Sequence, residues 1–225
     1  AGFARDLLQA TLFGTGPAVS AFVVAYRIPN YLRRIFAEGS FSSAFVPVLS
    51  ELREKGDEAQ IRDFLNHIAG ALLAVVLVVT ALGIGLSPWI AQVFLAFADK
   101  DSEQVTLTAS MLRITFPYLT FISMTALAGA VMNSFRHFGL PAFIPVLHNL
   151  AIIFTMLVLA PLFDIPAYAL AWGVLLAGIL QFCVMWPALA RFGMKPAFRL
   201  DFKHPGVQRV FKLMLPTIFS SSVAQ

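Results

Sequence analysis

The chain has 225 residues, of which 59% are hydrophobic and only 12% are charged, whereas soluble domains carry about 25% charged residues. This composition and a mean hydropathy of +0.80 exclude an ordinary soluble domain. The net charge of +4 comes from basic residues in short connectors, which indicates contact with membrane-surface phosphates rather than with nucleic acid. The single cysteine, Cys183, excludes an intramolecular disulfide and a cysteine-rich metal site.

In chain order, long apolar segments alternate with short polar or turn-forming ones, of which 51–63 is a polar connector inside which the next helix can start. A helix needs about 20 apolar residues to cross the hydrocarbon core of a bilayer, and most of the apolar segments are that long. Breaks are expected at Ser87-Pro88 and at Pro117, because proline removes a helical hydrogen bond. We expect spans at 1–14, 18–50, 64–97, 104–133, 142–160 and 167–190, then a basic connector at 191–209 and a seventh apolar segment.

These segments are too long for outer-membrane strands of about 10 residues and show no alternation of period two. Because lipid offers the backbone no hydrogen-bond partners, such spans must be helices. The predicted fold class is all-α: a polytopic transmembrane helical bundle of six spans plus the start of a seventh. The sequence opens at AGFARD without a signal-peptide pattern and stops inside an apolar run, so we expect a longer parent chain.

The distribution of lysine and arginine predicts the orientation. Connectors 51–63, 134–141 and 191–212 carry ten basic residues and would share one side of the membrane, whereas the opposite turns carry only Lys100. Cytoplasmic loops are the ones enriched in lysine and arginine. We therefore expect the N-terminus in the cytoplasm.

Several basic residues fall inside the expected spans rather than in the connectors. Each would cost at least about 2.5–3.5 kcal/mol at the bilayer centre, so each needs a water-filled cavity or a partner. The five residues are Arg5, Arg27, Arg33, Arg34 and Arg113.

The second expected span carries a polar stripe. Its members follow a 3-4-4 spacing, which places them on one helical face, and the last two can form an ion pair. Pro29 and Gly39 should bend the span, so the stripe predicts the wall of an internal cavity. The stripe consists of Arg27, Asn30, Arg34 and Glu38.

Structural interpretations stay open for part of this set. Arg27 can lie near the outer surface and extend its charge to water. Arg34 and Glu38 can form a purely structural pair, and Arg113 can bond a neighbouring carbonyl.

A functional role is favoured for Arg5 and Arg33, because no acidic residue lies one helical turn from either. Asp6, next to Arg5, is expected to face elsewhere on the helix. A guanidinium group binds two phosphate oxygens and keeps its charge when desolvated, so the arginines predict an anionic substrate, for which a diphosphate fits.

Other chemistry is sparse in the sequence. The four histidines are scattered, and we expect no metal site and no cofactor. Serine-rich stretches such as SFSS (40–43) have no histidine and aspartate arranged around them, so we expect no enzyme site.

The stretches GFARD, IPNYLRRIFAEGSFSSAFVPVLSE, ITFPYL and GLPAFIPVLHNLA resemble the MurJ (MviN) lipid II flippase family of bacteria, part of a superfamily of multidrug and polysaccharide exporters. The resemblance implies an inner-membrane transporter with two helical lobes, monomeric at full length. By alternating access it would move an undecaprenyl-diphosphate-linked peptidoglycan precursor out of the cytoplasmic leaflet. Residues 1–190 would then be the N-terminal lobe, and 191–225 the cytoplasmic connector and the start of helix seven, with the C-terminal lobe absent.

The resemblance also implies residue roles. Arg5 and Arg33 match family arginines that engage the diphosphate. Asp6, Arg34 and Glu38 match positions that line or gate the cavity, and Pro29 and Asn30 match the break in the second helix. One departure is Ser20, which stands where the family usually has an acidic residue.

Three alternatives to a flippase stay open from the sequence. One is a multidrug or polysaccharide exporter of the same superfamily, of which the drug exporters would favour acidic cavity residues for cationic substrates. A membrane enzyme acting on polyprenyl phosphates would need a cluster of aspartate, histidine or serine nucleophiles. A non-transporting scaffold would leave the intramembrane arginines without a role.

Overall fold

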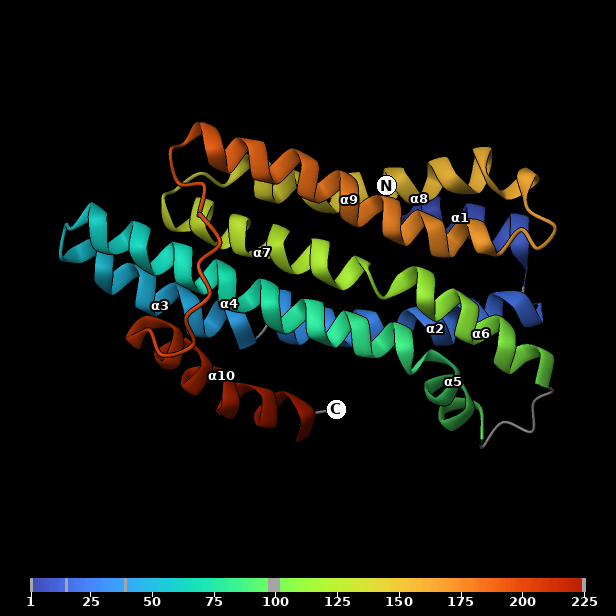
Figure 1. Cartoon of the computed structure of the whole chain (residues 1–225). Coiled ribbons are helices and arrows are strands. Elements are labelled where there is room, and N and C mark those ends of the chain that lie inside the picture. Colours follow the sequence, from blue (N-terminus) through green and yellow to red (C-terminus); the bar gives the residue numbers. More distant parts are fainter. Residues whose placement is uncertain (1, 15, 39, 97–101, 224–225) are drawn as a thin grey trace. The chain divides into compact units, whose positions relative to one another are not determined.

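The computed structural model describes residues 2–14, 16–38, 40–96 and 102–223, and every regular element among them is a helix (Figure 1). The expected all-α class is confirmed. The elements are α1 (Gly2–Phe13), α2 (Pro17–Arg33), a π-helix (Arg34–Glu38), α3 (Ser40–Glu54), α4 (Glu58–Gly85), α5 (Ser87–Leu95), α6 (Ser102–Thr115), α7 (Tyr118–Ser134), α8 (Gly139–Val158), a 3-10 turn (Ala160–Leu162), α9 (Tyr168–Arg191) and α10 (Pro205–Val223).

Within the described residues, four segments are long and apolar enough to cross a membrane. They correspond to the third through sixth expected spans. The first two expected spans are built from shorter pieces, α1, α2 and α3, of 12, 17 and 15 residues. The total of six spans plus a seventh therefore stays a prediction. The four segments are Glu58–Gly85, Ser102–Ser134, Gly139–Leu162 and Tyr168–Arg191.

Segment 51–63 is mostly helical: it begins within α3, and α4 starts inside it at Glu58, so the connector is shorter than expected. Only residues 55–57 separate α3 from α4. The Asp57 carboxylate caps α4, because its Oδ1 accepts hydrogen bonds from the backbone N–H groups of Ala59 (2.9 Å) and Gln60 (3.2 Å). The charged residues therefore cover the end of α3, the turn and the first turns of α4.

The chain divides into two compact units. Unit 1 comprises Ala1–Tyr31, Val78–Phe121 and Phe143–Gln181. Unit 2 comprises Leu32–Leu77, Ile122–Ala142 and Phe182–Gln225.

Unit 1 contains an aromatic group around the buried Tyr118. The ring centre of Tyr118 lies 6.4 Å from that of Tyr26 and 5.9 Å from that of His148. Helices α8 and α9 approach closely at Gly173, where an added Cβ would lie 2.3 Å from Oγ1 of Thr155. Small residues allow such close helix packing in membranes.

Unit 2 has an aromatic core and a cation that joins two helix ends. Phe45 of α3 stacks on Phe64 of α4 with ring centres 5.7 Å apart. Arg53 of α3 donates a hydrogen bond to the backbone carbonyl of Ser134, the last residue of α7. Its guanidinium carbon also lies 4.4 Å from the ring centre of Phe135, a cation–π contact. Arg53 thus ties the end of α3 to the end of α7.

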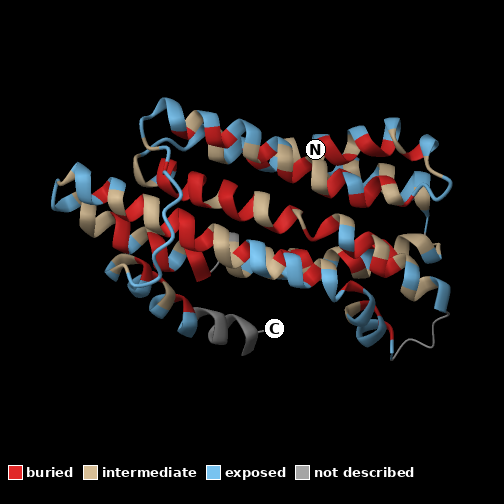
Figure 2. Ribbon diagram, in the orientation of Figure 1, coloured by how far each residue is buried: buried red, intermediate tan, exposed pale blue. Residues whose placement is uncertain are grey.

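Large apolar side chains are exposed on several helices, and Figure 2 shows where exposed residues lie along the chain. In the most apolar 18 residues of Ser102–Ser134, 72% of the residues are buried. In the corresponding stretch of Gly139–Leu162, only 28% are buried. An apolar surface of this extent fits a lipid environment. Examples of exposed side chains are Leu82, Trp89, Phe94, Phe154 and Leu157.

Candidate functional site

Arg5 lies in α1 and forms an ion pair with its neighbour Asp6. The Arg5 Nη2 atom is 2.6 Å from Oδ1 of Asp6, and Nε donates a second hydrogen bond of 2.9 Å to the same oxygen. Arg5 is partly buried, whereas Asp6 is exposed. This corrects the expectation that Asp6 faces away from Arg5. A long arginine side chain can fold back along the helix surface, which a projection of Cα positions does not capture.

Helix α2 carries the next predicted residues. Pro29 is buried inside the helix, and Asn30 is partly buried. Arg33 is the last residue of α2 and is also partly buried, whereas Arg27 is exposed.

The helix type changes directly after Arg33. Residues Arg34–Glu38 form a π-helix, in which the backbone bonds run from i to i+5 rather than to i+4. The predicted stripe assumed 3.6 residues per turn, so its spacing holds as far as Arg34 and not beyond it. Arg34 is exposed. The side chain of Glu38 and residue Gly39 lie outside the described part of the chain, so the predicted Arg34–Glu38 pair stays a prediction.

The two units divide the predicted residues between them. Arg5, Asp6, Pro29 and Asn30 belong to unit 1, whereas Arg33 and Arg34 belong to unit 2. Their assembly into one cavity therefore stays a prediction.

Arg113 has a structural partner. Its Nε donates a 2.9 Å hydrogen bond to Oγ of Ser87, which is fully buried at the start of α5. The partner is a hydroxyl group rather than the expected carbonyl. This bond joins α6 to α5 within unit 1.

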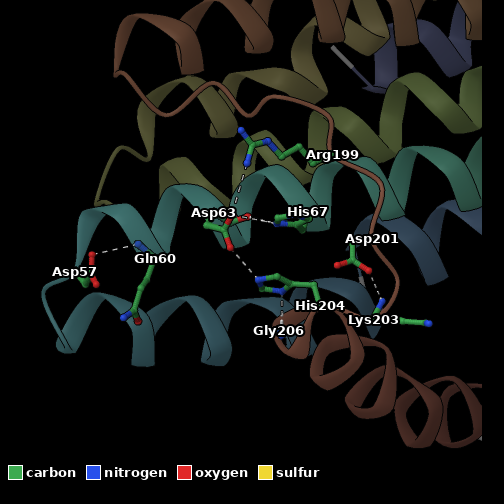
Figure 3. A network of polar contacts seen from close by, with 9 residues as sticks. All are labelled: Asp57, Gln60, Asp63, His67, Arg199, Asp201, Lys203, His204 and Gly206. Carbon is green, nitrogen blue, oxygen red and sulfur yellow. Dashed lines mark hydrogen bonds and ion pairs between the residues drawn. The ribbon is translucent and has the colours of Figure 1, made fainter.

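Unit 2 contains a polar cluster that the sequence did not predict (Figure 3). Asp63, His67 and His204 bring one nitrogen or carboxylate oxygen each to within 4.8 Å of the others. The expectation that the histidines are scattered is therefore wrong for two of them. Asp63 and His67 lie one turn apart on α4, a spacing visible in the sequence, but His204 lies 141 positions after Asp63. No local sequence pattern indicates that His204 lies beside Asp63.

A cavity of about 580 Å³ lies beside this cluster, between α3, α4 and the start of α10. Glu51 lines it and pairs with Lys55 (3.1 Å) and with Arg209 (2.6 Å). Hydrogen bonds from Lys55 and then Arg209 hold the pKa of Glu51 below its usual 4.5. The Arg209 pair joins the start of α10 to α3.

Comparison with known proteins gives a consistent result. The profile of the family described as lipid II flippase MurJ matches residues 9–225. A lipid II flippase MurJ from Burkholderia cenocepacia is 41% identical over 228 residues, which cover 100% of this chain and 44% of that protein. A probable lipid II flippase MurJ from Haemophilus influenzae is 42% identical over 231 residues, 100% of this chain and 45% of that protein.

A solved structure described as lipid II flippase MurJ in an inward closed conformation superposes with a TM-score of 0.79. It is 26% identical in sequence, and the match covers 100% of this chain and 45% of the solved chain. The predicted helical membrane bundle is thereby confirmed. The chain spans slightly less than half the length of the curated relatives it matches. It belongs to the lipid II flippase MurJ family.

Proposed function

We propose that this chain forms the N-terminal lobe of a flippase for an undecaprenyl-diphosphate-linked peptidoglycan precursor. The carrying observation is the family match over residues 9–225, in which relatives named lipid II flippase align along the whole chain. Residues 1–190 are the membrane lobe, and residues 191–225 form the connector and the start of helix seven. The family match favours this function over a multidrug exporter, a lipid-phosphate enzyme or a scaffold.

Arg5 and Arg33 bind the diphosphate in this proposal. A guanidinium fork donates two parallel hydrogen bonds to phosphate oxygens and stays charged in a dry site. The Arg5–Asp6 ion pair removes the argument that Arg5 lacks an acidic partner, so this role rests on the resemblance to the family; a diphosphate would compete with Asp6 for the cation. Arg34 contributes to the same positive surface.

The π-helix after Arg33 supports a moving element. π-helical turns are uncommon and occur frequently at functional sites. Pro29 lies one turn before it, so the helical hydrogen bonding is weakened at both ends of the segment that carries Asn30 and Arg33. We assign the gating of the cavity to this segment together with Glu38 and Gly39, which follow it in the sequence.

The orientation belongs to the proposal: inner membrane, N-terminus in the cytoplasm, and the α3–α4 turn on the cytoplasmic side. A cysteine introduced by Glu58→Cys into a cysteine-free background should resist an impermeant thiol reagent in intact cells. Glu103→Cys, at the start of α6 on the opposite side, serves as the matched control and should react readily. Both residues are exposed, so burial does not explain a difference. Rapid labelling of the Glu58→Cys protein would contradict the proposed orientation.

Transport is tested directly with the full-length protein in liposomes. Lipid-linked precursor placed in one leaflet should become accessible to an added lectin or hydrolase only when the protein is present. Vesicles that show the same accessibility with and without the protein would contradict the proposed function.

A further inference from the structure

The segment between α9 and α10, residues 192–204, lies against α4 and is called the strap below (Figure 3). Asn66 of α4 accepts two hydrogen bonds from the backbone of the strap. The N–H of Ala197 donates to Oδ1 of Asn66 (2.7 Å), and the N–H of Arg199 donates to the Asn66 carbonyl (3.1 Å). Phe198 also stacks on Trp186, with ring centres 5.4 Å apart.

The end of the strap presents His204 to Asp63 in one defined tautomer. The backbone N–H of Gly206, in the first turn of α10, donates to Nδ1 of His204 at 3.1 Å. Nδ1 is therefore the unprotonated nitrogen, and a neutral ring must carry its proton on Nε2. That nitrogen lies 3.1 Å from Oδ2 of Asp63, so it donates to the carboxylate. His204 thus joins the first turn of α10 to α4.

His67 completes the arrangement from the α4 side. Its ring is stacked on that of His204 with centres 4.6 Å apart and an interplanar angle of 13°. Its Nδ1 lies 2.8 Å from the backbone carbonyl of Asp63 and 3.4 Å from Oδ1 of the same residue. The two imidazole rings therefore share one carboxylate.

These contacts disfavour a metal ion. A metal bound at Nε2 of His204 would need the lone pair of that nitrogen and would move the ring proton to Nδ1. The N–H of Gly206 already points at Nδ1, so two donors would then face each other. Two nearly parallel rings also cannot both direct an in-plane lone pair at one ion between them.

The same geometry makes the contact sensitive to protons. Arg199 lies 4.0 Å from Asp63, so carboxylate and guanidinium already balance when both rings are neutral. Around the adjoining cavity, Glu51 faces Lys55 and Arg209, which leaves one excess positive charge. Asp201 and Lys203, which also lie on the strap, are exposed, and Asp201 accepts the Lys203 backbone N–H.

We propose that Asp63, His67 and His204 form a pH-sensitive latch that fastens the strap and the start of α10 to α4. Histidine changes its charge between about pH 5 and 8. Protonation of His204 puts a hydrogen on Nδ1 opposite the Gly206 N–H and removes that cap from α10. The Nε2–H contact of His204 with Asp63 survives this protonation, but protonation of both rings stacks two positive charges beside Arg199 on a single carboxylate. The latch is closed when the histidines are neutral and opens once both are charged.

The Glu51 ion pairs do not account for a response in this range. The pKa of Glu51 is held below 4.5, so this carboxylate stays ionised throughout the interval in which histidine titrates. The pairs with Lys55 and Arg209 are lost only as the pH falls through that lowered pKa.

Hydrogen–deuterium exchange of the full-length protein in lipid nanodiscs tests the latch. After correction for the intrinsic pH dependence of exchange, segment 196–206 should exchange about two- to tenfold faster near pH 5.5 than near pH 8, as expected for the loss of the neutral hydrogen bond from Gly206 to Nδ1 of His204. Equal protection at the two pH values would overturn the proposal. The readout does not involve transport, so this outcome would leave the proposed flippase function standing.

Three variants assign the response to the cluster. His204→Gln keeps a neutral donor toward Asp63 and should stay protected at both pH values, so acid release that persists in this variant contradicts the proposal. Asp63→Asn removes the charged acceptor, so segment 196–206 should exchange fast at both pH values. Continued protection in this variant would also contradict the proposal. His137→Gln is the matched control, because His137 stacks on Phe192 in the same unit but outside the latch, and it should respond as the wild type does.

The alternative that the cluster binds a metal ion is tested in the same samples. Zn²⁺ added near pH 8 should leave the exchange of segment 196–206 unchanged. Protection that depends on Zn²⁺ and disappears in His204→Gln would identify a metal site in place of the proton latch.

Discussion

Arg33→Ala in the full-length protein is expected to abolish nearly all complementation of a flippase-depleted strain, and Arg33→Lys most of it. Lysine keeps the charge but is a single-point donor, whereas a guanidinium fork holds two oxygens of a diphosphate. A hydrogen bond to a charged group contributes about 1.5–3 kcal/mol, so its loss should weaken binding of the lipid-linked precursor roughly ten- to hundredfold. Growth of the strain and binding by the purified variants are the measurements, with protein levels in the membrane as the check on insertion.

Arg34→Ala is the matched comparison, since Arg34 is the adjacent residue and is exposed. Its effect should be milder than that of Arg33→Ala if Arg34 only pairs with Glu38, and Glu38→Gln should then reproduce it. Full complementation and normal binding by Arg33→Lys would refute the bidentate contact. If Arg33→Ala also behaved normally, Arg33 would be structural, and the proposed substrate site would lose its central residue.

Gly70→Ala is expected to displace the strap from α4. A Cβ at this position would lie 2.2 Å from the carbonyl oxygen of Arg199 and 2.6 Å from its carbon, both backbone atoms that cannot turn aside. The strap would have to move, and the two hydrogen bonds to Asn66 would lengthen or break. At about 0.5–1.5 kcal/mol for each bond, the docked state should lose roughly 1–3 kcal/mol. Limited proteolysis and amide exchange of residues 192–204 should report the release.

Gly85→Ala provides the control on the same helix. Gly85 is the last residue of α4, and an added Cβ there would have no atom within 4 Å. This variant should keep the strap protected, because alanine also favours the helical conformation. An unchanged strap in Gly70→Ala would show that the close approach is not needed for docking.

The sequence by itself determined the class of this protein. Long apolar segments with few charges can satisfy their backbone only as helices in lipid, so the all-α membrane bundle follows from composition and segment length. The breaks at Ser87-Pro88 and Pro117 were also predictable, since proline acts locally: α5 begins at Ser87, and α7 begins just after Pro117. The contiguous block around Arg33 carried the resemblance to the family.

Only the tertiary structure decided how the charged side chains pair. The contact of Arg5 with Asp6 depends on side-chain torsions, which a helical projection does not contain. The π-helix changes the angular spacing of the side chains after Arg33, and the residue spacing in the sequence does not predict this change. His204 reaches Asp63 across 141 positions, and Gly70 has a role only because the backbone of Arg199 crosses it. Hydropathy and proline act within a single helical segment, whereas these contacts depend on the path of the whole chain.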